Sequence, residues 1–182
     1  MSCHLDVRGP LDLQASLYRP LDAEQGSGHR SRAIAPTHSC TIWYMLIDHT
    51  VTIDAPPFDV FDTYVRVENW PEWTETMTAV RRLDPGPIRV GARTRIKQPK
   101  LREAVWEVTE IDPGRSFTWV ARMPGIVTTA RHVVTPTGDG SSVLLSVGQS
   151  GLLGPVVGLM TKRLTERYLA IEGAGLKRLC EK

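Results

Sequence analysis

The sequence predicts an α+β fold, with an antiparallel sheet of about seven strands, two short helices after the first strand and a long helix at the C-terminus. Short segments of alternating apolar and polar residues follow one another from residue 46 to residue 150, and turns rich in Pro, Gly and Asp separate them. Alternation of this kind is typical of half-buried strands joined as hairpins. From Pro155 onward, apolar residues recur at helical spacing almost to Lys182.

The first strand is expected at residues 46–53, where His49 shares one face with apolar side chains. Residues 54–57 end this strand and open a helix, because proline is tolerated in a first helical turn. An apolar stripe over residues 58–65 predicts that helix, and residues 69–73 predict a second short helical turn. Both helices therefore precede the remaining strands.

The rest of the sheet is expected to be a meander of about six strands. Each alternating segment is followed by a short turn and then by another such segment, as in successive hairpins. No repeat or low-complexity tract interrupts this succession. The expected strands are residues 76–83, 92–98, 101–111, 115–123, 126–135 and 141–150.

One predicted hairpin, turning at residues 112–114, carries a large aromatic side chain on each of its strands. Trp106 and Val108 lie on one face of the first strand, and Trp119 and Ala121 lie on one face of the returning strand. Proline presets a turn dihedral and glycine tolerates a positive φ, so the Asp-Pro-Gly sequence favours a turn. The two tryptophans either fill a core or line a cavity.

The C-terminal helix is expected to run from Pro155 nearly to Lys182. Its apolar positions recur every three or four residues and predict one face toward the sheet, while the opposite face carries charged residues such as Glu172. Gly173 and Gly175 cost helix propensity, so we expect them to allow close approach to the sheet or to leave room above a cavity. The predicted inward face consists of Val156, Met160, Leu164, Tyr168, Ile171, Gly175 and Leu179.

Residues 1–44 are predicted to be a disordered or loosely ordered N-terminal extension, and residues 45–182 the folded domain. The extension mixes Pro, Gly, Ser and Arg without a sustained apolar period, so it cannot bury enough surface to offset its ordering entropy. It also lacks the apolar region of a secretory signal. Because regular alternation begins at Leu46, two translation starts stay open, Met1 and Met45.

Composition and charge argue against several classes of partner. The formal net charge of +2 is small and the chain has no run of Lys or Arg, so we expect no nucleic acid. The longest nearly uninterrupted apolar run, Ile42–Ile47, is too short to cross a bilayer. Three cysteines without a CxxC pair fit a cytoplasmic protein better than a disulfide framework or a zinc site. We expect no metal and no cofactor, and either a monomer or a homodimer.

Several short motifs stand out in this order of elements. They are Val51–Pro56 leading into Val60–Phe61, Asn69–Trp73, the Trp106–Trp119 hairpin, Asp139–Gly140 and Leu176–Lys177. In this order and spacing they resemble the START-like (SRPBCC) superfamily, in particular its polyketide cyclase/dehydrase and lipid-transport branch, over about residues 46–181. The resemblance implies a helix-grip fold, in which a curved antiparallel sheet wraps around the C-terminal helix and leaves a hydrophobic cavity between them.

Ligand cavities commonly have an apolar wall with a few polar groups that fix orientation. Strand parity puts His132 and Val134 on one face of their strand. The candidates for general acid–base chemistry are His132, Tyr168 and His49, although a histidine on an apolar face is more often a hydrogen-bonded core residue. The expected ligand contacts are Trp70, Trp106, Val108, Trp119, Ala121, His132, Val134, Met160, Leu164 and Tyr168.

Three classes of function stay open. The leading interpretation is binding of a hydrophobic small molecule, either a lipid, a polyketide or an aromatic compound, in the implied cavity. The alternatives are a polyketide cyclase/dehydratase in the same cavity and a protein-interaction module without a ligand. Cyclisation needs an acid or base close to an enolisable carbon. The pattern places no carboxylate on an inward face, so enzymatic activity stays open.

Overall fold

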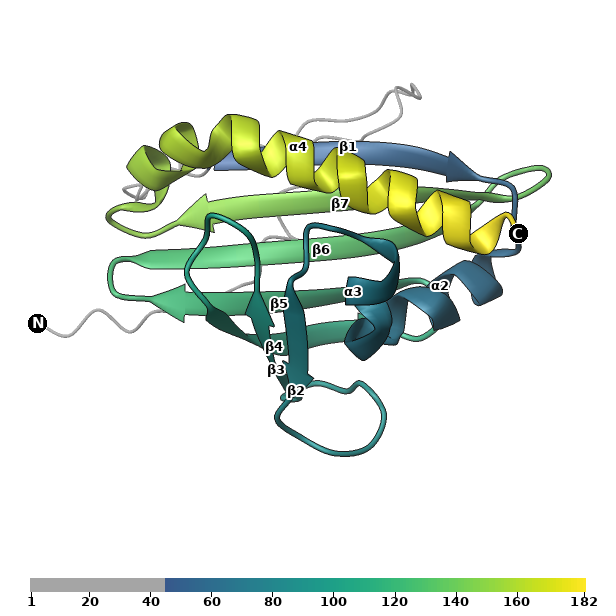
Figure 1. Cartoon of the computed structure of the whole chain (residues 1–182), viewed down its shortest axis with the longest axis horizontal. Helices are drawn as coiled ribbons and strands as arrows, with labels where there is room; N and C mark the ends of the chain where they lie inside the picture. Colours follow the sequence, from purple (N-terminus) through teal and green to yellow (C-terminus); the bar gives the residue numbers. More distant parts are fainter. Residues whose placement is uncertain (1–44) are drawn as a thin grey trace, which may run out of the picture. The chain divides into compact units, whose positions relative to one another are not determined.

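Residues 45–182 are the part of the chain that the computed structural model describes, and they follow the predicted order of elements (Figure 1). The strands are β1 (Met45–Ile53), β2 (Ala79–Arg82), β3 (Arg93–Lys97), β4 (Ala104–Asp112), β5 (Ser116–Met123), β6 (Ile126–Pro136) and β7 (Ser141–Ser150). The helical segments are α2 (Pro57–Val65), the short 3₁₀ turn η1 (Val67–Asn69), α3 (Trp70–Trp73) and α4 (Gly154–Cys180). The predicted extension over residues 1–44, and with it the choice between two translation starts, lies outside the described residues.

All seven described strands form one antiparallel sheet in the order β1-β7-β6-β5-β4-β3-β2. Consecutive strands from β2 to β7 pair with one another, and β1 pairs along its whole length with β7 at the other edge. Figure 1 shows β2 and β3 turned steeply against the long strands, while α4 lies over β1 and β7. The predicted α+β helix-grip fold, with about seven strands and a long C-terminal helix, is confirmed.

The pairing register sets which side chains share the inner face of the sheet. Trp119 lies opposite Val108 on β4 and opposite Ala130 on β6, and Ala130 lies opposite Val147 on β7. Paired residues of neighbouring strands point to the same face, and a slip of one residue would turn the whole set outward. Val108, Trp119 and Ala130 are buried, so the tryptophan hairpin belongs to the core face.

The turn of this hairpin forms as predicted. Gly114 has a φ of 80°, and a backbone hydrogen bond of 2.9 Å closes the turn. Between Val108 and Glu110 the register of β4 shifts by a bulge. The extra residue changes the parity of the strand, so that Ile111 pairs with Phe117 on the core face.

The predicted inner face of α4 is wrong. Along most of the helix, the buried residues come one position after the predicted ones. Met160 is 80% exposed, whereas Glu172, expected on the solvated face, is 5% exposed. A Cβ on Gly158 would lie 2.9 Å from a β1 side chain, and one on Gly173 would lie 3.2 Å from the ring of His49. Because the helix backbone approaches the strands this closely, small residues take the inner face. The buried positions of α4 are Gly154, Gly158, Leu169, Glu172, Gly173, Gly175 and Leu176.

Candidate functional site

An aromatic cluster occupies the region where α2 and α3 cover the sheet. It consists of Tyr64 from α2, Trp70 from α3, Phe117 and Trp119 from β5, and His132 from β6. The distances between ring centroids run from 4.5 Å for Phe117 and His132 to 5.8 Å for Trp119 and His132. Each of these residues is 5% exposed or less. We call this set the aromatic cluster, and its tilted and edge-on contacts are the arrangements that aromatic rings prefer.

A buried carboxyl group from α4 meets the aromatic cluster. The Tyr64 hydroxyl donates a hydrogen bond to Oε1 of Glu172. Burial raises the pKa of Glu172 to about 7, and the hydrogen bond from Tyr64 offsets part of that rise. Burial and the nearby Glu172 charge raise the pKa of Tyr64 well above its ordinary value of 10.0. A carboxyl group that titrates near neutral pH inside a protein can accept or donate a proton at physiological pH.

His132 stands next to this pair as a neutral imidazole. Its ring centroid lies 4.8 Å from that of Tyr64 and stacks on Trp70 at 5.7 Å with an interplanar angle of 19°. Burial lowers the pKa of His132 to about 3, so the ring carries no charge near neutral pH. Its Nδ1 is buried and makes no hydrogen bond to a described residue.

Other buried polar atoms also lack a hydrogen-bond partner among residues 45–182. They include the indole Nε1 atoms of Trp73 and Trp119 and the side-chain oxygen of Gln149. Buried polar groups in native proteins are nearly always paired with protein, water or a bound molecule. These atoms are therefore available to form hydrogen bonds with a ligand or with ordered water.

Several predicted ligand contacts lie together. Trp70, Trp119 and His132 belong to the aromatic cluster, and Trp106 lies beside it with its centroid 5.4 Å from that of Trp119. Trp106 is half-buried, so it stands at the border of the cluster. The remaining predicted contacts on the strands, which are all buried, are Val108, Ala121 and Val134.

The predicted contacts on α4 are less well grouped. Met160 lies on the outer face of the helix, because the glycines turn the other side of α4 to the strands. Leu164 and Tyr168 are half-buried. The Tyr168 hydroxyl donates to the carbonyl oxygen of Pro99 and so ties α4 to the loop between β3 and β4. His49, the third acid–base candidate, is half-buried on β1 with Gly173 above its ring.

A row of small side chains crosses the sheet next to Trp106. Ala121 lies opposite Trp106 on one side and opposite Thr128 on the other, and Thr128 lies opposite Gln149. Ala121 and Thr128 are buried, and Gly158 of α4 packs against Gln149. Short side chains at this end of the strands fill less of the space beneath the helix than branched aliphatic residues would.

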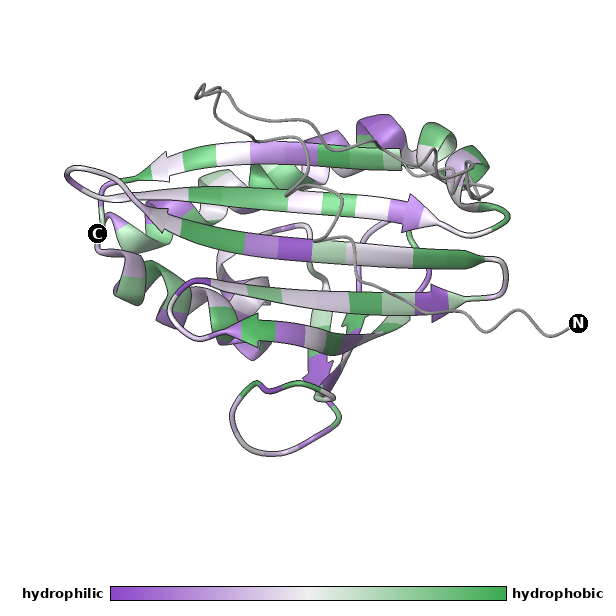
Figure 2. Ribbon diagram, turned by 180° about the vertical axis from the view of Figure 1, so that it is seen from behind, coloured by the Kyte–Doolittle hydropathy of each residue, from purple (hydrophilic) through white to green (hydrophobic). Residues whose placement is uncertain are grey.

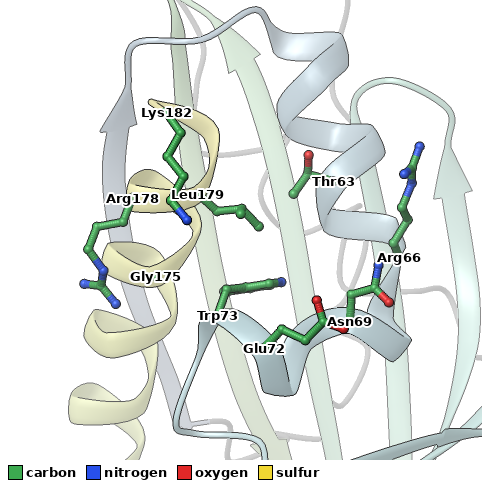
Figure 3. A pocket seen from close by; sticks show the side chains of 9 residues that line it. All are labelled: Thr63, Arg66, Asn69, Glu72, Trp73, Gly175, Arg178, Leu179 and Lys182. Carbon is green, nitrogen blue, oxygen red and sulfur yellow. The ribbon is translucent and has the colours of Figure 1, made fainter.

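A groove of about 740 Å³ opens between the end of α4 and the segment from α2 to α3 (Figure 3). Figure 3 shows Trp73 and Leu179 directed into this groove, with Arg66 and Arg178 at its two sides. The Trp73 ring packs edge-on against Tyr64 at a centroid distance of 6.1 Å, so one ring separates the groove from the phenol. The lining residues are Thr63, Arg66, Asn69, Glu72, Trp73, Gly175, Arg178, Leu179 and Lys182.

Three residues of the aromatic cluster and its buried carboxyl group, Tyr64, Phe117 and Glu172, were not predicted as functional. Tyr64 was part of an apolar helix stripe, and Glu172 was assigned to the solvated face of the last helix. The spacing of Glu172 from Leu169 and Leu176, three and four residues away, puts all three on one helix face. That spacing is the signal in the sequence that could have identified an inward carboxylate.

Within residues 45–182, no group of three His, Cys, Asp or Glu side chains could hold a metal ion. None of the described helices combines the length and the apolar character needed to cross a membrane. The candidate site consists of the aromatic cluster, the phenol–carboxyl pair of Tyr64 and Glu172, and several unpaired polar atoms.

Comparison with known proteins decides the family. Residues 46–181 match the family model described as polyketide cyclase/dehydrase and lipid transport. The chain belongs to this family. The resemblance to the START-like superfamily is thereby confirmed, and the polyketide cyclase/dehydrase and lipid-transport family accounts for nearly all of the described residues. Comparison with curated protein sequences gives no match.

Solved structures show the same fold at low sequence identity. Norcoclaurine synthase from Thalictrum flavum is 16% identical with a TM-score of 0.62, and the match covers 86% of this chain and 98% of that one. The Zhui aromatase/cyclase from Streptomyces sp. R1128 is 17% identical with a TM-score of 0.59, over 76% of this chain and 94% of that one. The di-domain aromatase/cyclase BexL from the BE-7585A biosynthetic pathway is 16% identical with a TM-score of 0.60, over 76% of this chain and 50% of that one. At these identities the likeness establishes the fold of the family.

Proposed function

We propose that this protein binds a hydrophobic small molecule of the aromatic or polyketide type between the inner face of the sheet and α4. The observation that carries the proposal is the pairing of aromatic rings with unpaired buried polar atoms, above all Trp119 Nε1 and His132 Nδ1. A planar ligand with carbonyl or hydroxyl oxygens supplies ring surface and hydrogen-bond partners together. A plain aliphatic chain supplies neither.

The energetic argument supports the same class of ligand. A buried polar group without a partner costs about 1 to 3 kcal/mol, and a ligand oxygen recovers that cost on binding. We take the row of Ala121 and Thr128 beside Trp106 as the place of binding, because its side chains are short and buried. Family membership and the cyclase structures of the same fold support ligand binding as well.

The test is a titration with emodin, a planar polyhydroxylated aromatic, followed by tryptophan fluorescence and native mass spectrometry, with dodecanoate as the aliphatic comparison. We expect one emodin per chain and weaker binding of dodecanoate. Trp119→Phe keeps a ring but removes the N–H donor, so we expect about tenfold weaker emodin binding. Trp73→Phe makes the same change at the groove and should leave the affinity unchanged.

The opposite result for these two variants would place the ligand in the Trp73 groove and contradict the proposal. Binding of dodecanoate as tightly as emodin would contradict the ligand class. Both variants retain an aromatic ring, but phenyl is smaller than indole, so circular dichroism and thermal unfolding must verify that a lost affinity is not a lost fold.

A second candidate function is a cyclase/dehydratase, and the Tyr64–Glu172 pair is the observation that favours it. A general base works best when its pKa lies near the operating pH, as burial arranges for Glu172. In a dehydration, a base removes a proton next to a carbonyl while an acid protonates the departing hydroxyl, so that water leaves. The phenol–carboxyl pair contains one group for each step.

Glu172→Gln tests this candidate, because the amide still accepts a hydrogen bond from Tyr64 but cannot take a proton. If the protein is a dehydratase, it should turn over a cyclic β-hydroxyketone, and Glu172→Gln should slow turnover at least about 100-fold with unchanged binding. Binding of emodin without any turnover of such substrates by the natural protein supports the carrier instead.

A further inference from the structure

Six apolar side chains at one end of the molecule face outward. Five belong to the turn before α4 and to its first two turns, and the sixth, Met123, lies at the end of β5. Their exposed fractions run from 39% for Met123 to 90% for Leu152. We call this set the apolar end patch, and it consists of Met123, Leu152, Leu153, Val156, Leu159 and Met160.

The backbone holds these side chains outside the core. Gly154 and Gly158 take the inner positions of α4 and pack on Gln149, so the apolar residues between them are turned away from the sheet. The Leu153 N–H donates to the carbonyl oxygen of Gly125 over 2.9 Å, which joins this turn to the β5–β6 turn beside Met123. Figure 2 shows hydrophobic residues at the turn before α4 and at the start of α4. An apolar surface fixed in this way marks a contact with a partner or a membrane.

The charge around the apolar end patch is positive. From residue 116 to residue 165 the sequence has a single acidic residue, Asp139, in the β6–β7 turn at the opposite end of the strands. Exposed cations border the patch on two elements, Arg122 on β5 and Lys162 and Arg163 on α4. Lys162 also lies 3.8 Å from Glu166, one turn further along the helix.

We propose that the apolar end patch docks onto the surface of an anionic lipid bilayer. Leucine, valine and methionine side chains insert at the boundary of headgroups and acyl chains, and flanking lysines and arginines bind anionic headgroups. A second copy of the chain fits the patch less well, because it would bring Arg122, Lys162 and Arg163 of both copies together in an apolar contact. The inner side of the same helix turns packs on Gln149, so docking sets the proposed ligand site close to the bilayer.

The experiment is flotation of the full chain with vesicles of pure phosphatidylcholine and with vesicles of phosphatidylcholine and phosphatidylglycerol in equal parts. We expect binding to the anionic vesicles at low salt and weaker binding at high salt. The double substitution Leu159→Ser with Met160→Ser should reduce the partition coefficient about tenfold or more. Lys162→Gln with Arg163→Gln should reduce it about fivefold per charge removed, on anionic vesicles only.

Phe58→Ser is the matched control, because Phe58 is also an exposed apolar side chain but lies on α2, away from the patch. It should leave vesicle binding unchanged. Absence of binding to both kinds of vesicle would overturn the proposal. A second copy of the chain or residues 1–44 would then be the alternative partners of the patch. Equal losses for Phe58→Ser and for the patch variant would also overturn it. Emodin binding, measured in parallel without vesicles, separates failure here from failure of the proposed function.

Discussion

The two halves of α4 arrange their side chains in opposite ways. In the first half, apolar residues such as Leu159 face outward while glycines pack on the strands. In the second half, Leu169 and Leu176 are buried, but the carboxyl group of Glu172 lies buried with them. Neither half is the simple amphipathic helix that hydrophobic spacing predicts. The difference shows that close backbone approach, rather than apolar area, sets the rotation of this helix about its axis.

The largest expected effect contrasts one leucine from each half. Leu169→Ala empties a position that is 5% exposed and should lower the free energy of unfolding by about 3 to 4 kcal/mol. Leu159→Ala, at a position that is 69% exposed, should change it by less than about 0.5 kcal/mol. Urea denaturation of both variants at one pH measures the contrast. Similar losses would mean that the first half of the helix is part of the core.

The next largest effect is a pH dependence of the free energy of unfolding, which arises from Glu172 in the second half of α4. Burial raises the pKa of this carboxyl from 4.5 to about 7, so the folded state holds the proton more tightly than the unfolded state. The stabilisation is complete below pH 4.5 and is lost as the pH rises through about 7, a loss of about 3 kcal/mol. Glu172→Gln has no proton to lose at this position.

The measurement is urea denaturation of the natural protein and of Glu172→Gln across this pH range. The stability of the variant relative to the natural protein should increase by about 3 kcal/mol as the pH rises. Other titrating groups are common to both proteins and cancel in the difference. A constant difference at all pH values would mean that Glu172 titrates normally in the folded protein.

The titration of His132 should change the free energy of unfolding with pH in the opposite direction. Burial lowers its pKa from 6.5 to about 3, so its stabilising contribution is present above pH 6.5 and is lost as the pH falls through that range. His132→Phe keeps a ring in the aromatic cluster without this titration. Between pH 4.5 and pH 6.5 the stability of the variant relative to the natural protein should rise by roughly 3 kcal/mol as the pH falls. In the natural protein the slopes from His132 and Glu172 oppose each other over that interval. The stability differences of the two single variants from the natural protein should therefore change with pH in opposite directions, and this is the distinctive result.

The comparison of the two halves also separates what periodicity can predict from what it cannot. The meander from β2 to β7 and the hairpin at Gly114 follow from local alternation and turn chemistry, and both are confirmed. These features depend on residues close together in the sequence. The inner position of Glu172 depends instead on its hydrogen bond to Tyr64, 108 residues earlier in the chain. A charged residue in a helix is ordinarily solvated, so pattern alone assigned it to the outer face.

The candidate site divides in the same way. Strand parity placed Trp119, Val108 and Ala121 together on one face, and all three are buried. A strand residue can point to only two faces, so the alternating pattern fixes which residues share a face. Met160 was placed inward by helix spacing, where an error of one position rotates a residue by about 100°. The glycines that correct this rotation are visible in the sequence, but the strand atoms that they approach are known only from the structure.

The smallest expected effect compares the cost of adding a Cβ to a glycine in each half of α4. A Cβ on Gly175 would lie 2.5 Å from the backbone oxygen of Trp73, which cannot move without shifting α3. A Cβ on Gly158 would lie 2.9 Å from Oε1 of Gln149, which can rotate away. It would also lie 2.9 Å from the Cβ of Met45, which moves only with the backbone at the start of the edge strand β1. Alanine improves helix propensity by about 1 kcal/mol at either position, and this gain offsets part of the steric cost.

Gly175→Ala should therefore destabilise the fold by about 2 kcal/mol, whereas Gly158→Ala should stay within about 1 kcal/mol of the natural protein. Urea denaturation at fixed pH measures both free energies of unfolding. Equal and large costs would show that Gln149 and Met45 are held as rigidly as the backbone of Trp73. In that case close backbone approach would set the rotation of the first half of α4 as strictly as that of the second. The apolar residues of the first half would then face outward because Gly158 must pack against Gln149 and Met45.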